Sequence, residues 1–246
     1  MCNGAEGKRL TNCVDPIQIA EQLVSSERCE VAVIKCGSRG AIVSTAKSTE
    51  RVPAYETKSV WPIGSGDVFA GAFSVHWAVH RQDPVEAARS ASLHAANYCE
   101  TKQLYPPSGD RSEKVWSGGE PKLVYLAGPF FSMPQIWLIN ESLTALRSQG
   151  FKVFSPLHHV GRGAAKDVYA PDIAGIEQCD LVFACVDGLD AGTLFEIGYA
   201  KAKGKPVVAF VQNEKREDLK MLEGSECYLE RDFVTAIYRT SWASND

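Results

Sequence analysis

The stretch from Asp180 to Gly204 constrains the fold more than any other part of this sequence. It begins with an apolar run of strand length at 181–186 and passes through an acidic, glycine-containing turn. Apolar residues at helical spacing follow at 193–203, and Gly204 is a typical helix stop signal. A strand that turns through glycines into a helix places the turn at the carboxyl edge of a sheet. Open α/β folds bind their ligands at that edge.

Three carboxylates are predicted to converge at this turn. Asp187 and Asp190 belong to the turn itself, and Glu196 is expected in the first turn of the helix. Clustered acids without a basic partner are costly, which favours a chemical role over a packing role. For Asp187 two interpretations stay open, contact with a substrate or shaping of the turn. Asp180, directly before the strand, is expected to be a structural acid.

The same alternation of strands and helices extends over residues 122–211. A strand is expected to end in the Gly128-Pro129 turn, and the strand at 181–186 and helix at 193–203 come later. The other expected elements are a helix at 135–148, a strand at 151–155, a loop at 156–166, a helix at 171–178 and a strand at 206–211. This order predicts an α/β fold of the flavodoxin or Rossmann type, a parallel sheet with helices on both faces.

The composition is typical of a soluble globular protein, with 45% hydrophobic and 23% charged residues. The net charge of −4 gives no reason to expect binding to nucleic acid or to a membrane surface. No apolar run approaches the roughly 20 residues of a membrane span, and the N-terminus lacks the apolar core of a signal peptide. The 8 cysteines form no CxxC pair, which favours reduced thiols over disulfides or metal ligands. We therefore expect a cytoplasmic protein without a metal or cofactor.

The first part of the chain also alternates between helix and strand signals. Asp15 and Pro16 are typical of an N-cap and a first helical residue, for a helix to about residue 25. The other expected elements are strands at 30–36 and 41–44, an extended segment at 53–60 and helices at 68–80 and 84–98. Residues 106–121 are polar and rich in proline and glycine, which is typical of a linker. The expected parts are therefore a domain at 1–105, a linker at 106–121 and a domain at 122–246.

The tetrapeptide Gly64-Ser65-Gly66-Asp67 opens one of these helices. Glycines let backbone N–H groups approach an anion, and a helix N-terminus favours negative charge. Asp67 could then accept a proton from a hydroxyl group that attacks a phosphate. A plain tight turn with a helix cap has the same sequence pattern, so both interpretations stay open.

The first part of the chain resembles the ribokinase-like (phosphofructokinase-B type) sugar kinases. The resemblance rests on Asn3-Gly4-Ala5-Glu6, on the glycine turn at 37–40 and on the tetrapeptide at 64–67, in that order. It implies a partial ribokinase-like α/β domain with a vestigial kinase anion hole at 64–67. The family's sugar-binding strands and lid have no counterpart in this sequence, and Trp61-Pro62-Ile63 replaces the usual Asp-Thr segment. We therefore do not expect sugar phosphorylation.

Residues 122–242 resemble the nucleoside 2-deoxyribosyltransferase family. The matching motifs are Tyr125-Leu126-Ala127-Gly128-Pro129, Asp172 seven residues before Cys179-Asp180, and Asp190-x-Gly192-Thr193-x-x-Glu196-x-Gly198-Tyr199-Ala200. Members of this family cleave the N-glycosidic bond of a 2′-deoxynucleoside and leave the deoxyribosyl group on a carboxylate. They then transfer that group to another nucleobase, which implies a role in nucleotide salvage.

The resemblance implies a role for each matching residue. Glu196 matches the nucleophile, Asp172 the acid that assists the departing base, Tyr125 the tyrosine that orients the nucleophile, and Asp190 the carboxylate that binds the sugar hydroxyls. Further substrate contacts are expected from Gly128, Phe130, Asp187 and Gly192. We expect the helix N-terminus to keep Glu196 ionised. Neighbouring carboxylates are expected to raise the pKa of Asp172 so that it holds a proton near neutral pH.

Asp190 favours nucleosides over nucleotides as substrates. A related branch of 5′-monophosphate hydrolases carries serine at this position, and an aspartate would repel a phosphate. Arg162 and Lys166 keep the alternative of a 5′-monophosphate N-glycosidase open, because either could neutralise a phosphate. A third alternative is a regulatory module that senses ATP and carries an inactive transferase domain. Family members are oligomers, which implies a homo-oligomer with Trp137 as a candidate interface residue.

Overall fold

The computed structural model describes residues 1–26, 29–104 and 122–244. The chain divides into two compact units, Met1–Gly118 and Gly119–Asp246. The linker predicted at 106–121 lies outside the described residues. Within the described ranges, no helix combines the length and the apolar character that a bilayer crossing requires.

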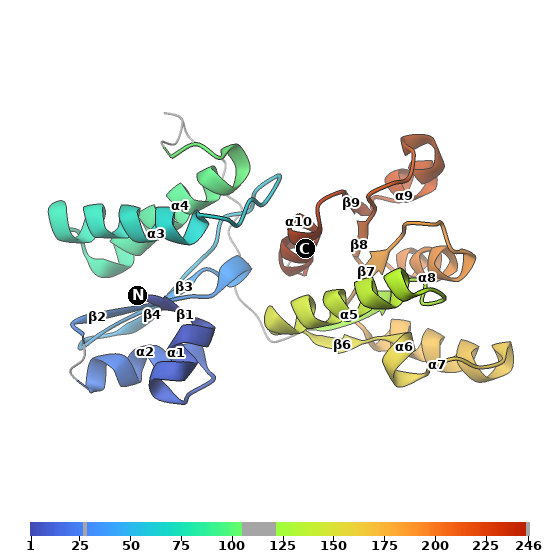
Figure 1. Ribbon diagram of the computed structural model, residues 1–246, viewed down its shortest axis with the longest axis horizontal. Helices are drawn as coiled ribbons and strands as arrows, with labels where there is room; N and C mark the ends of the chain where they lie inside the picture. Colours follow the sequence, from blue (N-terminus) through green and yellow to red (C-terminus); the bar gives the residue numbers. More distant parts are fainter. Residues whose placement is uncertain (27–28, 105–121, 245–246) are drawn as a thin grey trace. The chain divides into compact units, whose positions relative to one another are not determined.

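The first unit contains a four-stranded sheet in the order β1-β2-β3-β4. The strands are β1 (Cys2–Asn3), β2 (Val31–Lys35), β3 (Ala41–Thr45) and β4 (Thr49–Val52). β1 runs parallel to β2, and the other neighbouring pairs are antiparallel. Helices α1 (Gly4–Thr11) and α2 (Pro16–Ser25) cover one face, while α3 (Ser65–Ser74), the π-helical turn η2 (Val75–Val79) and α4 (Pro84–Thr101) cover the other (Figure 1).

Strand alternation explains how the two faces of this sheet are covered. Val33 and Val43 pack with Phe69 and Phe73 of α3, while Ile34 and neighbouring apolar residues pack with α2. Residues one apart on a strand point to opposite faces, so one apolar strand contributes to both cores.

The structure confirms α2 at the predicted bounds and corrects two other expectations in this unit. The capping box between Asn3 and Glu6 begins α1, a helix that the sequence analysis did not include. Gly64 takes the left-handed conformation, with φ 84°, as the N-cap of α3, so this helix begins at Ser65 rather than at residue 68. The segment at 53–60, expected to be extended, directly follows β4, which makes the ladder pairing with β3.

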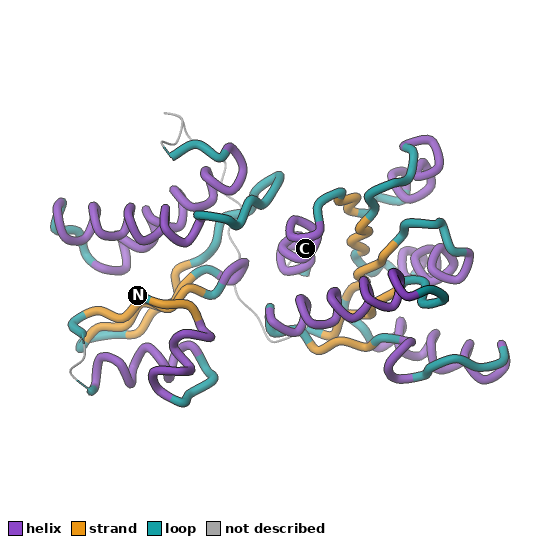
Figure 2. Tube along the Cα trace, viewed as in Figure 1, coloured by secondary structure: helices purple, strands orange, loops and turns teal. Residues whose placement is uncertain are grey.

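The second unit contains a five-stranded sheet in which every strand is parallel, in the order β6-β5-β7-β8-β9. The strands are β5 (Leu123–Ala127), β6 (Lys152–Phe154), β7 (Leu181–Cys185), β8 (Val207–Phe210) and β9 (Tyr228–Glu230). Figure 2 shows these strands between helices. The predicted fold class, a parallel α/β sheet preceded by a partial ribokinase-like α/β unit, is confirmed.

Two apolar cores lie on the two faces of the parallel sheet. Tyr125 and Ala127 of β5 belong to one core with Ile176 and Ile197, and Leu126 belongs to the other. The helices on the Tyr125 face are α7 (Ala165–Gln178), α8 (Ala191–Ala202) and α9 (Lys220–Gly224), while α5 (Met133–Ser148) and α10 (Phe233–Ala243) cover the opposite face. The remaining short elements are α6 (Pro156–His159) and the 3₁₀ turn η3 (Arg216–Leu219).

Several elements of this unit depart from the sequence-based expectations. Helix α6 forms within the predicted loop, and β9 and α10 were not anticipated. Helix α7 begins at Ala165 instead of residue 171, with Pro171 inside it. Proline has no backbone N–H group, so the carbonyl of Asp167 has no helical hydrogen-bond partner. Both residues are exposed, so solvent can supply the missing hydrogen bond.

Candidate active site

Tyr125 and Glu196 form the centre of a candidate site at the carboxyl edge of the parallel sheet. The hydroxyl of Tyr125 donates a hydrogen bond of 2.6 Å to Oε1 of Glu196. Tyr125 is fully buried in β5, and Glu196 is the sixth residue of α8. Glu196 therefore lies in the second helical turn, because the helix begins at Ala191, two residues earlier than predicted. The expectation of a first-turn position was wrong.

Burial dominates the electrostatics of Glu196. The pKa of this carboxyl group is raised to about 7. Burial is the largest cause, the hydrogen bond from Tyr125 opposes it, and the charges of Asp172 and Asp190 add smaller increases. The expectation that a helix N-terminus keeps Glu196 ionised is therefore corrected, since desolvation of the carboxylate is the largest influence. Burial and the neighbouring Glu196 carboxylate also raise the pKa of Tyr125, which stays a hydrogen-bond donor.

Asp172 lies on α7 beside this pair. Its Oδ1 atom is buried and has no hydrogen-bond partner among the described residues. Burial raises the pKa of the Asp172 carboxyl group. The direction agrees with the expectation, but the cause is desolvation rather than the neighbouring carboxylates. A carboxyl group of this kind is suited to hold a proton and to donate it to a ligand.

Asp190 is the N-cap of α8. Its Oδ2 atom accepts hydrogen bonds from the backbone N–H of Thr193 at 2.8 Å and from the Thr193 hydroxyl at 3.0 Å. No donor in the described part of the chain hydrogen-bonds to Oδ1, which is left for a ligand. A Cβ atom at Gly192 would lie 3.1 Å from Oδ2 of Asp190, so a small residue suits this position.

Asp187 holds the turn after β7 to the turn after β8. Its carboxylate accepts hydrogen bonds from the backbone N–H groups of Gln212 and Asn213 and from the side-chain amide of Asn213, at 2.9–3.0 Å. Asp180 accepts a hydrogen bond of 2.6 Å from the backbone N–H of Leu123, as expected of a structural acid. Of the other acids in the 180–196 stretch, Asp190 lies close enough to Glu196 to raise its pKa.

The turn after β5 packs tightly and brings two phenylalanines to the same edge. A Cβ atom at Gly128 would lie 2.7 Å from Cδ1 of Ile139, so no larger residue fits there. The rings of Phe130 and Phe131 stack at 5.7 Å between centroids, and Arg162 donates a 2.7 Å hydrogen bond to the carbonyl of Phe130. The turn therefore joins a basic side chain and an aromatic pair.

The first unit places its tetrapeptide beside a lysine that sequence reasoning missed. Asp67 lies in the first turn of α3, and the backbone N–H groups of Ser65 and Asp67 donate to the carbonyls of Pro62 and Gly64. A Cβ atom at Gly66 would lie 2.9 Å from Nζ of Lys35. A cation at a helix N-terminus is unfavourable by itself and favours a bound anion between the two.

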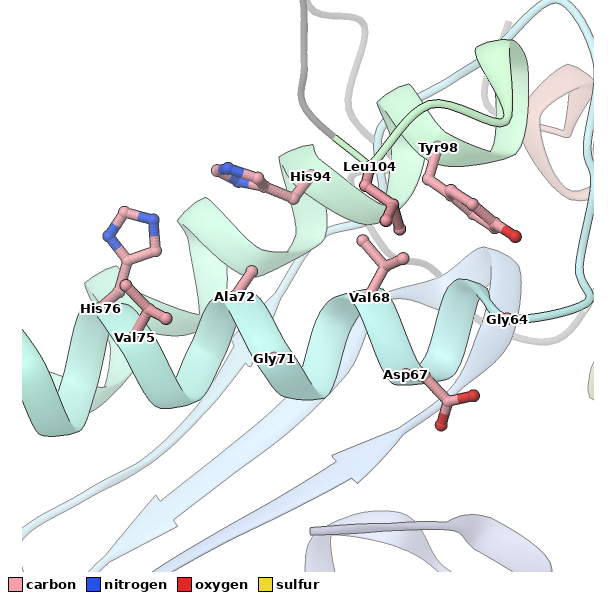
Figure 3. A pocket seen from close by; sticks show the side chains of 10 residues that line it. All are labelled: Gly64, Asp67, Val68, Gly71, Ala72, Val75, His76, His94, Tyr98 and Leu104. Atoms are coloured by element: carbon pink, nitrogen blue, oxygen red, sulfur yellow. The ribbon is translucent and has the colours of Figure 1, made fainter.

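A cavity of about 540 Å³ lies next to this turn, between α3 and α4 (Figure 3). Figure 3 shows Asp67 near the start of α3, Tyr98 on α4 and His76 toward the far end of the cavity. The Nδ1 atom of His76 is buried without a hydrogen-bond partner among the described residues. In the same described ranges, no three His, Cys, Asp or Glu side chains gather as a metal site requires.

Comparison with known proteins assigns the two halves separately. Residues 124–227 match the family model for nucleoside 2-deoxyribosyltransferase, and residues 2–109 match the model for the pfkB family of carbohydrate kinases. Each half of the chain is thus similar to a different family. The candidate site with Tyr125, Asp172 and Glu196 lies wholly within the deoxyribosyltransferase segment, and the tetrapeptide at 64–67 lies in the pfkB segment.

Solved structures similar to this chain include members of both groups. A 2-deoxyribosyltransferase from Bacillus psychrosaccharolyticus is 25% identical, with a TM-score of 0.37, and the match covers 46% of this chain and 95% of that one. A nucleoside kinase from Burkholderia thailandensis, solved with inosine, is 27% identical, with a TM-score of 0.35, over 42% of this chain and 33% of that one.

The curated relatives are two much longer proteins of Arabidopsis thaliana. ABC transporter B family members 16 and 15 are 28% identical over 121 residues and 30% identical over 115 residues. The matches cover 49% and 46% of this chain, and the chain spans 9% of the length of either transporter.

Two residues next to the candidate site were not singled out from the sequence. Phe154, the last residue of β6, stacks on the ring of Tyr125 with centroids 5.5 Å apart. Gly175 of α7 lies against Phe154. An apolar residue in a short strand and a glycine in a helix carry no signal that separates them from other core positions, so only the folded arrangement identifies them.

Proposed function

We propose that the second unit cleaves the N-glycosidic bond of 2′-deoxynucleosides and transfers the deoxyribosyl group to another nucleobase or to water. The observation that carries the proposal is the hydrogen bond from Tyr125 to Glu196, next to the unpartnered, buried oxygen of Asp172. Tyr125 holds one carboxyl group in place, and burial raises the pKa of a second carboxyl group beside it. Cleavage of a glycosidic bond with covalent capture requires this pair of groups.

In the first step, a carboxylate oxygen of Glu196 attacks C1′ of the sugar. Tyr125 holds Oε1, so Oε2 is the attacking atom. The ester bond forms as the C1′–N bond breaks, and the bonding electrons pass to the base nitrogen. Asp172 donates its proton to the departing base, so the base does not leave as an anion.

In the second step, a nitrogen of the acceptor base attacks C1′ and displaces Glu196. The Asp172 carboxylate takes the proton that the incoming base releases, and this restores both groups. Water in place of the base gives hydrolysis and free deoxyribose. Because capture on Glu196 divides the displacement into two steps, the sugar can wait for the second base.

Asp190 supports a nucleoside as substrate. Its Oδ2 is engaged in the helix cap, while Oδ1 can accept a hydrogen bond from a free sugar hydroxyl. A phosphate dianion at the same place would meet a fixed negative charge. Arg162 keeps the 5′-monophosphate N-glycosidase as the alternative, although its guanidinium already donates to the carbonyl of Phe130.

The proposal is tested by chromatography of deoxyadenosine, deoxycytidine and deoxyadenosine monophosphate, each with and without a second free base. A new deoxynucleoside that forms only with the acceptor base supports the transferase. Free base released only from the monophosphate moves the protein to the hydrolase alternative. Glu196→Ala should remove all turnover while circular dichroism stays unchanged, and a variant that keeps most of its activity would contradict the assignment of the nucleophile.

A second candidate function, binding of ATP by the first unit, is favoured by the contact between Lys35 and Gly66 and by the adjacent cavity. Asp67, Gly64 and Ser65 would then line the phosphate end of the site. Isothermal titration with ATP tests this function, with Lys35→Met as the variant. Saturable heat that the variant loses supports ATP sensing, and identical traces for both proteins contradict it.

Exposed apolar residues on α5 support a homo-oligomer of the second unit. Phe131, Met133 and Trp137 are 69%, 80% and 63% exposed near the start of this helix. Light scattering during size-exclusion chromatography tests this proposal. A Trp137→Glu variant that is smaller than the wild type supports it, and a monomeric wild type contradicts it.

A further inference from the structure

The ring of Phe154 lies between two other rings beside the candidate site. It stacks on Tyr125 with centroids 5.5 Å apart and an interplanar angle of 17°. It also stacks on His159 at 5.0 Å and 15°. The backbone N–H of Ser155 donates a 3.1 Å hydrogen bond to Nδ1 of His159, which fixes the outer ring. Phe154 therefore has little freedom to rotate.

Helix α7 contacts the edge of this ring through a glycine. A Cβ atom at Gly175 would lie 2.6 Å from Cε1, 2.8 Å from Cδ1 and 2.9 Å from Cζ of Phe154. Separations below 3.0 Å do not occur between packed carbon atoms, so any side chain at this position must displace the ring or the helix. Because two stacked rings hold Phe154, α7 is the element that would move. The approach of α7 to the sheet thus depends on the absence of a side chain at residue 175.

Asp172 lies on the same helix, three residues before Gly175. Residues three apart share a helix face, so an outward shift of α7 at Gly175 carries the carboxyl group of Asp172 away from the site. The same Phe154 ring supports Tyr125, whose hydroxyl holds Glu196. One contact therefore determines where the proton donor lies relative to the nucleophile.

We propose that Phe154 and Gly175 are positioning residues, whose contact sets the distance between Asp172 and the Tyr125–Glu196 pair. The inference rests on the proposed function of this site. Neither residue takes part in a bond-making step. Their effect is on the geometry of proton transfer, where a misplacement of about 1 Å can lower the rate by about 100-fold.

The test uses Gly175→Ala, with Gly224→Ala as a matched control. Gly224 lies at the end of α9, and apart from its chain neighbours and the backbone of its own helix, no described atom lies within 4 Å of a Cβ built there. For Gly175→Ala we expect kcat to fall by about 100-fold with little change in KM. The descending limb of the pH profile of kcat reports the loss of the Asp172 proton. This limb should move to lower pH, because Asp172 gains solvent and its pKa falls. The control should keep the wild-type rate and profile.

Phe154→Leu provides a second test if Gly175→Ala does not fold. Leucine removes both ring stacks but keeps the position apolar, and it should shift the same limb of the pH profile. In the double variant, the aromatic ring that the added methyl group would meet is absent, so the two effects on stability should be less than additive. A wild-type pH profile in either folded single variant overturns the inference. A wild-type protein that cleaves no nucleoside overturns the proposed function instead, so the two failures are distinguishable.

Discussion

The hydroxyl of Tyr125 lies 2.6 Å from Oε1 of Glu196, although 71 positions separate the two residues in the chain. The hydrogen bond is possible because β5 and α8 meet at the carboxyl edge of the sheet. It stabilises the ionised form of a carboxyl group whose pKa burial has raised to about 7. Glu196 therefore gains and loses its proton near neutral pH, and both the activity and the stability of the protein should depend on pH there.

Tyr125→Phe should move the ascending limb of the kcat/KM profile to higher pH. The variant loses the hydrogen bond that lowers the pKa of Glu196, while burial and the charges of Asp172 and Asp190 remain. A hydrogen bond to a charged group contributes roughly 1.5 kcal/mol, so we expect about a tenfold loss of kcat/KM, largest below pH 7. Tyr199→Phe is the control, because Tyr199 donates to the exposed Glu177. An unshifted limb in Tyr125→Phe would argue against this role.

Glu196→Gln should change how stability depends on pH. In the folded protein the pKa of Glu196 rises from 4.5 to about 7, so the folded state retains a proton that the unfolded state has released. Stability is therefore lost as pH rises from about 4.5 to 7 and is constant above that range. Across this range the loss is about 3 kcal/mol, at roughly 1.4 kcal/mol per pKa unit.

Urea unfolding of the wild type and of Glu196→Gln at pH 5 and pH 8 measures this effect. The variant should be more stable than the wild type at pH 8, by an amount that shrinks at pH 5. If the difference between the two proteins is the same at both pH values, Glu196 does not titrate as the structure indicates.

Asp172→Asn should slow cleavage most for bases that are poor leaving groups. The amide cannot donate the proton, so unactivated bases should lose about 10²- to 10⁴-fold in rate. A substrate whose base leaves readily as an anion should be affected much less. Single-turnover rates for a series of bases test this prediction, and an equal loss for every base would contradict the role of Asp172 as the acid.

Asp190→Ser should shift preference toward 5′-monophosphates. Serine retains an oxygen that can cap α8, so the helix should stay intact while the negative charge is lost. Asp190→Asn is the matched variant, since it keeps the size and the cap and removes the charge. The ratio of kcat/KM for deoxyadenosine monophosphate to that for deoxyadenosine should rise in both variants. An unchanged ratio would show that Asp190 does not select against phosphate.

Features encoded by neighbouring residues were predictable from the sequence. Asp15 and Pro16 define the start of α2, and the apolar strand and glycine turn after Asp180 define the sheet edge where Glu196 lies. The parallel α/β fold follows from the order of such segments. These signals are local, so they do not depend on what the rest of the chain does.

Features that depend on packing were not predictable. The sequence indicated an ionised Glu196 from its distance to the helix start, but burial under the surrounding elements has the larger effect. The sequence predicts a helix that begins at Pro171, whereas α7 begins at Ala165 and continues through Pro171. The contact of Gly175 with Phe154 joins two unremarkable positions, and the structure alone brings them together.

The most direct test of the central claim is mass spectrometry of acid-quenched enzyme after brief mixing with a 2′-deoxynucleoside in the absence of an acceptor base. The account predicts a mass increase equal to one deoxyribosyl group, on the peptide that contains Glu196, which disappears when a free base is added before the quench. Turnover at the normal rate with no adduct, or with an adduct on another residue, would contradict Glu196 as the nucleophile.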